Sequence, residues 1–553
     1  MKATVVLIIV GSLAAAGCSS SASKATSPEP STAPTTTVVP GGQYHRPACK
    51  TKTPAKVVAT PVAGSTTDFD IVSFDGTKIR AHWFPLHRTG VTDAATVLKG
   101  PGWGQPGDVN TAGSGYGIFG DMSIHSLNGA GYNVLTWDPR GFGASGGTVE
   151  SDSPDFEGRD TQRLIDWVSQ QPGVTLDAPG DPRIGMAGAS YGGAIQLITA
   201  AIDCRVDALV PQIAWHSLGT SLFKSDTAKR GWGDFLYTAA AKHSLDPHIT
   251  SAHTASDTTG VISAADTQWF LDRGPANLVK KITAPTLFEQ GTIDTLFSLD
   301  EAVTNYNILK ANGVPTAMLW MCSGHGVCLT NPGDQSSPAT AALVWLDHYL
   351  HGDWKANVLP FAYVDQNGTE FAADEFPPPA ATPISATGKG ALTLIADGGS
   401  GPATATGNSG VIGTIALGIT PAKATHAVNV PITATHAAHI VGAPTLTLHY
   451  SGTSPGGTSP TRVFAQLVDD KSGIVLGNQI TPIKVILDGK AHTITLPLEM
   501  VAFTATAGAH LTLQLVATTT AYSTPRLGGS INFTKVQVAL PTVTGATSTN
   551  AQT

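Results

Sequence analysis

Short apolar runs alternate with segments of helical period between residues 68 and about 351. The runs are rich in β-branched residues, as in residues 132–137, and have the length of buried strands. The segments between them space apolar residues for one helix face, as at Leu343 and Leu346. Strands that alternate with helices predict a mainly parallel sheet covered by helices, and we expect an α/β domain over residues 46–355.

Residues of about 215–283 interrupt this alternation. The stretch has mixed helical character and no clear strand. An insertion here would lie over the C-terminal edge of a parallel sheet, where such segments act as lids. We therefore expect a helical cap.

The pattern changes after about residue 360, where apolar and polar residues alternate strictly. Residues 445–450 are one example, and Gly, Pro and Ser turn signals separate such runs. Period-two alternation marks strands with one buried and one solvated face. It predicts an antiparallel β-sandwich over residues 376–541, after a connector at 356–375 and before a tail at 542–553.

The N-terminus has the pattern of an export signal. Lys2 precedes a short apolar run, and residues 1–17 are predicted to be a cleaved signal peptide because this run is too short to span a bilayer. Cys18 resembles the lipidated cysteine of bacterial lipoproteins, although Leu13 lies five residues before it where the usual spacing is three. An ordinary signal peptide is the alternative.

Residues 18–45 are rich in Ser, Thr and Pro and have almost no large apolar side chain. Such a composition cannot offset the entropy of ordering, so we expect a flexible tether. A lipid on Cys18 followed by this tether predicts an exported protein anchored at the outer face of the cell membrane.

Charge argues against a nucleic-acid partner. The 553 residues carry 32 Lys and Arg against 40 Asp and Glu, a formal net charge of −8, with no basic run to meet phosphates. The expected partners are a small acyl or peptide substrate and, through the anchor, a membrane.

The chain has five cysteines, and lipidation of Cys18 would account for the odd one. The other four can pair in an oxidising compartment. Cys322 and Cys328 flank a histidine and could close a small loop, which would leave Cys49 to pair with Cys204. Four cysteines allow three connectivities, so this pairing is a hypothesis.

The pattern G-x-S-x-G, which places a nucleophilic serine on a tight strand-to-helix turn, occurs around three serines. Ser145 precedes a loop and Ser454 lies in a turn of the predicted sandwich. Ser190 alone follows an apolar strand and precedes a credible helix, whose N-terminus would face a developing anion. We therefore predict Ser190 as the nucleophile.

The acid and base of such a triad follow the serine in the chain order Ser, Asp, His. Asp294 comes just after one predicted strand and His325 just after the next, where a doubly wound sheet gathers its chemistry. Asp300 is close enough in sequence to compete with Asp294. For the oxyanion we predict the backbone N–H of Tyr191 and an N–H of Trp103, from its backbone or its indole.

Alternatively, Trp103 only lines the substrate pocket, and Trp215 is also predicted to line it.

Two G-x-G-x-x-G matches, at Gly115 and Gly141, lack the strand or the helix of a dinucleotide site, so no cofactor is expected. His436 and His439 have no further ligands at useful spacing, and no metal site is predicted.

The residues around Ser190 carry a family resemblance. The stretches 138–143 and 181–193 resemble the X-Pro dipeptidyl-peptidase and cocaine-esterase-like serine hydrolases, and residues 441–448 and 464–469 resemble their C-terminal domain. The resemblance, over about residues 68–541, implies an α/β-hydrolase fold with a helical cap followed by a jelly roll. It also implies the triad Ser190, Asp294 and His325, with Tyr191 as an oxyanion donor. Members of known activity often supply a tyrosine hydroxyl from the loop after the earlier strand, whereas residues 99–110 contain Trp103 and no tyrosine, which puts proline-specific dipeptidase activity in doubt.

The sequence thus predicts an exported serine hydrolase that cleaves an acyl ester or amide bond through an acyl-Ser190 intermediate. A non-catalytic or vestigial envelope-binding lipoprotein is one alternative. An acyltransferase that uses the same triad is another.

Overall fold

The computed structural model describes residues 56–113, 122–354, 358–400, 423–522 and 527–549, together with residues 44, 46, 47, 49 and 54. The predicted signal peptide and Cys18 lie outside these residues, as does nearly all of the predicted tether. Residues Val39–Thr553 form one compact unit, in which the α/β part and the sandwich pack together.

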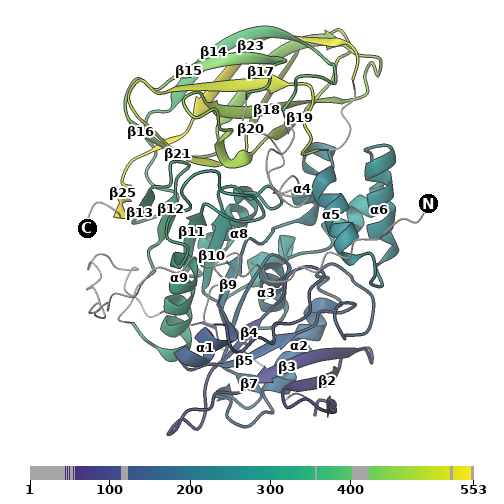
Figure 1. Cartoon of the computed structure of the whole chain (residues 1–553), viewed down its shortest axis with the longest axis vertical. Helices are drawn as coiled ribbons and strands as arrows, with labels where there is room; N and C mark the ends of the chain where they lie inside the picture. Colours follow the sequence, from purple (N-terminus) through teal and green to yellow (C-terminus); the bar gives the residue numbers. More distant parts are fainter. Residues whose placement is uncertain are drawn as a thin grey trace, which may run out of the picture. The chain divides into compact units, whose positions relative to one another are not determined.

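A twelve-stranded sheet forms the α/β part, in the order β1-β2-β3-β5-β4-β8-β9-β10-β11-β12-β13-β25 (Figure 1). Neighbours from β5 to β12 run parallel, and the pairs at both ends of the sheet run antiparallel. The strands are β1 (Ala59–Pro61), β2 (Asp68–Val72), β3 (Lys78–Phe84), β4 (Thr96–Lys99), β5 (Asn133–Trp137), β8 (Ile184–Ala189), β9 (Val206–Gln212), β10 (Thr286–Gly291), β11 (Thr316–Met321), β12 (Phe361–Val364), β13 (Glu370–Ala373) and β25 (Thr547–Ser548). A separate pair consists of β6 (Leu176–Ala178) and β7 (Asp181–Pro182).

Helices cover both faces of this sheet, because its central strands bury the side chains of both faces. In β9, Ala208 and Val210 pack in one apolar cluster, while Leu209 points into the other. The first cluster lies under α1 (Ile124–Ala130) and α9 (Ser337–Leu346). The second lies under α2 (Glu157–Val168), α3 (Tyr191–Ile202) and α8 (Leu299–Ala311). This is the α/β arrangement that the hydrophobic pattern predicts.

The helices between β9 and β10 form the cap. Figure 1 shows α4, α5 and α6 grouped together. Ser217 caps the first of them, and Asp246 caps α6 by accepting a hydrogen bond from the N–H of His248. The cap elements are α4 (Leu218–Leu222), η1 (Lys224–Asp226), α5 (Arg230–Ala240), α6 (Pro247–Thr258), α7 (Ala264–Leu271) and η2 (Ala276–Lys281).

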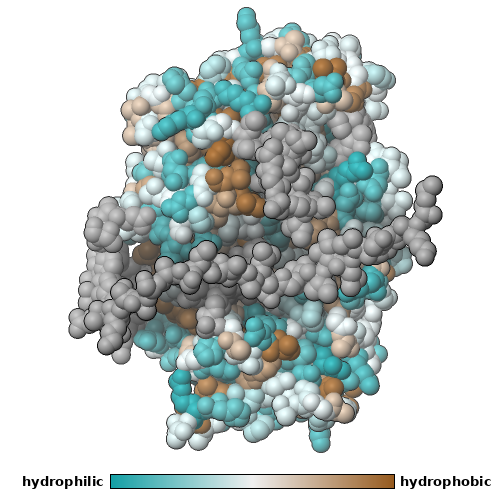
Figure 2. All heavy atoms as spheres, in the orientation of Figure 1, coloured by the Kyte–Doolittle hydropathy of each residue, from teal (hydrophilic) through white to brown (hydrophobic). Residues whose placement is uncertain are grey.

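The C-terminal part consists of two four-stranded antiparallel sheets, in the orders β14-β23-β17-β20 and β15-β22-β18-β19. Both sheets contribute to one apolar core, for example through Leu448 and Leu513. The predicted fold class is therefore confirmed. The outward positions of β20 are exposed threonines and a proline, and much of this part of the surface is white to teal in Figure 2. The strands are β14 (Ile384–Thr393), β15 (Ala427–Thr433), β17 (Thr445–Thr453), β18 (Thr461–Asp469), β19 (Thr481–Val485), β20 (His492–Pro497), β22 (His510–Val516) and β23 (Ser530–Leu540).

Two predicted segments differ from the structure. The predicted connector contains β12 and β13, which extend the large sheet because the edge of β11 is otherwise unpaired. The predicted tail contains β24 (Thr542–Val543) and β25. The first pairs with β16 (Ala438–Gly442) in a small sheet that also holds β21 (Val501–Ala505), and the second pairs with β13. The chain therefore returns to the α/β sheet at its end.

Among the described residues, two disulfides are present, Cys49–Cys204 and Cys322–Cys328, with Cα atoms 5.3 and 5.5 Å apart. The first joins the segment ahead of β1 to the residue that follows the C-cap of α3. The second encloses His325. Within the described part of the chain, no helix combines the length and the apolar character needed to cross a bilayer.

Candidate active site

Ser190 lies on a strained turn between β8 and α3. Its backbone has φ 58° and ψ −116°, a region that non-glycine residues rarely adopt. The turn is closely packed, since a Cβ at Gly192 would lie 2.2 Å from the carbonyl oxygen of Gly100. The Ser190 N–H donates to the carbonyl of Gln212 at 2.9 Å, which holds the turn on the neighbouring strand. This is the local geometry that G-x-S-x-G predicts.

His325 connects Ser190 to Asp294. His325 Nε2 lies 2.8 Å from Ser190 Oγ, and His325 Nδ1 lies 2.7 Å from Asp294 Oδ2. The second oxygen of Asp294 accepts hydrogen bonds from the N–H groups of Leu296 and Phe297, at 3.0 and 2.7 Å. The Asp294 side chain is fully buried and that of His325 nearly so. The carboxylate is thus fixed, and it fixes the imidazole with Nε2 directed at the serine.

Asp300, the competing acid, lies elsewhere. It stands in the first turn of α8, and its Oδ2 lies 2.9 Å from Lys224 Nζ. The imidazole of His325 packs instead between aromatic rings. The rings of Trp232 and Phe297 meet it edge to face, with centroids at 5.6 and 5.1 Å. Aromatic packing and the enclosing disulfide together restrict the orientation of this histidine.

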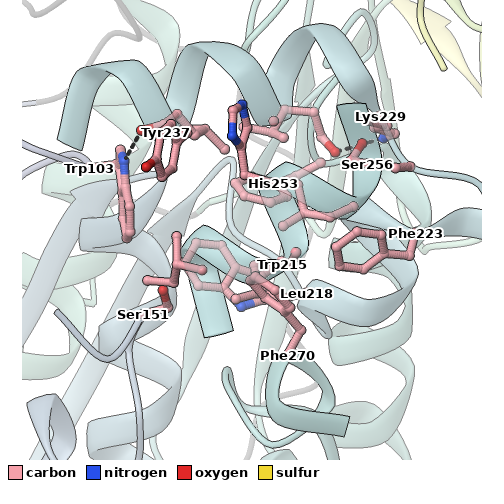
Figure 3. A pocket seen from close by; sticks show the side chains of 18 of the residues that line it. Trp103, Ser151, Trp215, Leu218, Phe223, Lys229, Tyr237, His253, Ser256 and Phe270 are labelled. Carbon is pink, nitrogen blue, oxygen red and sulfur yellow. Dashed lines mark hydrogen bonds between the residues drawn. The ribbon is translucent and has the colours of Figure 1, made fainter. Parts of the chain in front are cut away.

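The two predicted oxyanion donors, Tyr191 and Trp103, differ in whether their N–H groups are available. Tyr191 is the first residue of α3, so its backbone N–H belongs to the open N-terminus of a helix. The indole N–H of Trp103 donates to the carbonyl of Leu236 in α5 at 2.9 Å (Figure 3). The indole is therefore not a donor for the oxyanion, because its one hydrogen is directed at the cap. The backbone alternative for Trp103 stays a prediction.

The C-terminal part also contacts this site. Gln479 Nε2 donates to the backbone carbonyl of Asp294 at 2.6 Å, and Asn478 Nδ2 donates to that of Val327 at 3.0 Å. Asn478 is the last residue of the short helix η4 (Leu476–Asn478), and Gln479 follows it. No local signal in the sequence marks them, because the bonds join residues 185 and 151 positions apart. The two loops that carry the acid and the base are thus held from the sandwich side.

A cavity opens beside Ser190 beneath the cap. Its volume is about 100 Å³, against roughly 150 Å³ for an apolar cavity that holds benzene. Figure 3 shows the side chains of α5 and α6 reaching down into it, with Trp215 and Leu218 on the opposite side. Trp103 and Trp215 line it, as the sequence predicts for the pocket. The other lining residues are mainly apolar, including Leu218, Leu222, Phe223, Leu236, Ile249, Phe270, Leu296 and Phe297.

One group of side chains on the cap has the residue types of a cation site. Asp234, His253 and Asp257 place ligand atoms within 4.8 Å of one another. The guanidinium of Arg230 lies 3.2 Å from Asp257 and 3.8 Å from Asp234, and His253 Nε2 lies 3.0 Å from Asp234. Arg230 and His253 already engage both carboxylates, so the group does not require a metal.

Comparison with known proteins places the chain in a family. The sequence model of the X-Pro dipeptidyl-peptidase (S15 family) matches residues 27–326. The chain belongs to this family of hydrolases. A Rhodopirellula baltica protein, provisionally named Xaa-Pro dipeptidyl-peptidase, is 24% identical over 253 residues, which cover 40% of this chain and 39% of that protein. The chain thus spans less than half the length of that curated relative.

Solved structures share the fold. A CocE/NonD family hydrolase of Staphylococcus aureus aligns with a TM-score of 0.61 at 14% identity, over 86% of this chain and 93% of that one. An α-amino acid ester hydrolase aligns with a TM-score of 0.63 at 12% identity, over 87% and 98%. Both alignments cover the α/β-hydrolase part and the C-terminal β domain, which agrees with the predicted fold class.

Proposed function

We propose that this S15-family chain is a serine hydrolase that cleaves an acyl ester or amide bond through an acyl-Ser190 intermediate. The observation that carries the proposal is the continuous chain of hydrogen bonds from Ser190 Oγ through His325 to Asp294. An intact chain of this kind, opening on an apolar cavity, disfavours a vestigial binding protein.

The geometry supports a two-stage mechanism. His325 Nε2 takes the proton of Ser190 Oγ as the oxygen attacks the acyl carbonyl, and Asp294 stabilises the imidazolium that forms. The oxyanion develops at the N-terminus of α3, where the Tyr191 N–H can donate to it. His325 returns the proton to the leaving group. A water activated by the same nitrogen then releases the acyl group from Ser190.

Labelling by a fluorophosphonate probe tests this proposal. The probe should modify the wild-type protein, and Ser190→Ala should remove both labelling and ester hydrolysis, with a loss in kcat of about 10⁶. Ser454→Ala is the matched control, because Ser454 occupies the same five-residue pattern outside the site. Labelling that survives in Ser190→Ala, or that disappears in Ser454→Ala, would contradict the assignment.

We also propose that the protein is exported and anchored by a lipid on Cys18. The short apolar run before Cys18 and the Ser-, Thr- and Pro-rich stretch after it support this. Metabolic labelling with a fatty acid should mark the wild type and not Cys18→Ala. Equal labelling of both proteins would refute the anchor and leave the enzymatic proposal untouched.

A further inference from the structure

The cavity beside Ser190 presents one lysine to an acyl group. Lys229 lines it, and among the described lining residues there is no carboxylate. Figure 3 shows Lys229 and Ser256 together at one end of the cavity, and Trp103 and Ser151 at the other. His253 is the remaining titratable side chain of the lining apart from Tyr191 and Tyr237, and its Nε2 faces Asp234. The rest of the described lining is mainly apolar, with a few hydroxyl groups such as those of Ser151 and Ser256, so Lys229 supplies its strongest hydrogen-bond donor.

Lys229 is held in place with hydrogen-bonding capacity to spare. It is the N-cap residue of α5 and 5% exposed, and its Nζ donates to the carbonyl of Leu296 at 2.8 Å. An ammonium group has three donors, so two remain for other acceptors. Lys229 lies one helical turn before Trp232, whose ring packs on His325. Lys229 and the ring that packs on His325 thus belong to the same end of α5, and Lys229 and Ser190 line the same cavity.

Several carboxylates already lie behind this wall. Lys224 Nζ lies 2.9 Å from Asp300 and 2.7 Å from the buried Glu499. Burial lowers the pKa of Lys229, while the carboxylates of Glu499, Asp294 and Glu301 oppose this shift. None of these carboxylates lines the cavity. A neutral acceptor from a substrate would add no charge here, whereas a further carboxylate would add a negative charge to a region that already holds several.

Two buried carboxyl groups next to Ser151 and Tyr191 do not offset the lysine. Asp152 and Glu157 are buried behind Ser151 and Tyr191 and do not line the cavity. The Asp152 N–H donates to the Tyr191 hydroxyl at 3.1 Å. Burial raises the pKa of Asp152 well above its usual range and that of Glu157 to about 8, so both favour the uncharged form. Neither supplies a counter-charge for a cation in the cavity.

We propose, on the basis of the acyl-serine function above, that the cavity takes a neutral, mainly apolar acyl group with one hydrogen-bond acceptor that Lys229 binds. It rejects an acyl group with a free ammonium. Such a cation would lose its hydration and meet a lysine, with no carboxylate in the described lining to pair with it. The site therefore disfavours dipeptides with a free N-terminus and favours keto-acyl or similar neutral acyl esters.

A set of p-nitrophenyl esters of matched length tests this. The acyl groups are hexanoate, 4-oxo- and 5-oxohexanoate, the glutarate monoester, and norleucine, which is hexanoate with a free α-ammonium. For the wild type, kcat/KM should be roughly 10-fold higher for the better oxo ester than for hexanoate, as expected for one hydrogen bond. It should be about 100-fold lower for norleucine, after correction for spontaneous hydrolysis. The glutarate monoester should fall below the oxo esters.

Two variants assign these ratios to the lysine. Lys229→Met should bring the oxo and hexanoate esters within about 2-fold of each other and reduce the penalty for norleucine. Lys224→Met is the matched control, because Lys224 belongs to the same ionic network but does not line the cavity, and its ratios should follow the wild type.

The outcomes separate this inference from the proposed function. Ester hydrolysis with norleucine equal to hexanoate, or an oxo preference that persists in Lys229→Met, would overturn the inference alone. The wild-type ratios decide it if Lys229→Met does not fold. No ester hydrolysis and no probe labelling in the wild type would overturn the proposed function and this inference with it.

Discussion

The two halves of the molecule use β-structure in opposite ways. In the α/β part, β10 is buried at every position, and polar side chains gather where such strands end. In the sandwich, β20 alternates between exposed and half-buried positions along its whole length. A strand covered on both faces leaves only its ends free for chemistry, and Ser190, Asp294 and His325 all follow strand ends. An alternating strand exposes one face to solvent.

The sandwich nevertheless departs from this pattern where it meets the α/β part. Strand β18 is buried at all nine positions. Arg462 on this strand donates to Thr227 Oγ1 of the cap at 2.7 Å, and Lys484 on β19 lies 2.6 Å from Asp226. The same side of the sandwich supplies Gln479 to the Asp294 loop. One sheet of the sandwich therefore faces solvent, and the other packs against the α/β part and its cap.

Among the variants that test this comparison, the largest effect is expected at the acid. Asp294→Asn removes the charge that stabilises the imidazolium and fixes its tautomer, so kcat should fall by about 10⁴. Asp300→Asn, which removes the competing acid from its ion pair with Lys224, should leave kcat within a few-fold of the wild type. Steady-state kinetics on a hexanoate ester measure both. Equal losses of kcat in the two variants would contradict the assignment of the catalytic acid to the strand end that carries Asp294.

An intermediate effect should come from the sandwich side. Gln479→Ala removes the donor to the Asp294 carbonyl and loosens the acid loop, so kcat should fall by roughly 10- to 100-fold with little change in KM. Gln466→Ala is the matched control, because Gln466 is also buried but bonds within the sandwich, to Gln514 at 2.8 Å. It should lower thermal stability without the loss in kcat.

The kinetics and melting temperature of the two glutamine variants decide the point. Equal kcat for Gln479→Ala and the wild type would show that the sandwich does not position the acid. Restoration of activity by raising the substrate concentration would also contradict a positioning role, since that would be an effect on binding.

The smallest effect is expected on the solvated face. Thr495 on β20 is exposed, and its hydroxyl lies 2.9 Å from that of Thr447 on the neighbouring strand. Thr495→Ala should change the free energy of unfolding by no more than about 0.5 kcal/mol and leave kcat unaffected. Denaturant unfolding measures this. A loss of activity would mean that the outer face also serves the site.

Sequence reasoning reaches the site as far as local patterns extend. Ser190 has a strand before it and a helix after it, and the chain order then restricts the acid and the base. Gln479 has no such signal, because its partner lies 185 residues away and is a backbone carbonyl. The direction of the Trp103 indole depends on Leu236 in the cap, whose position the sequence does not specify.

The strands at the edge of the large sheet are a similar case. Phe361 and Tyr363 on β12 are buried, but the run is only four residues long and begins ten residues after His351, where the last helical segment ends. Its pattern is compatible with a connector. Whether these residues form a strand depends on their pairing with β11, which is a long-range contact. The short β25 depends in turn on its pairing with β13.

The Cys49–Cys204 disulfide encloses residues 50–203 in a covalent loop. A mechanical load applied to the chain ahead of Cys49 would pass through the sulfur atoms to the residue after the C-cap of α3. It would bypass β1 to β8 and the turn that carries Ser190. Tension on the proposed membrane tether would therefore not separate the strands of the sheet from its N-terminal edge. The force would not pass through the turn that carries the nucleophile.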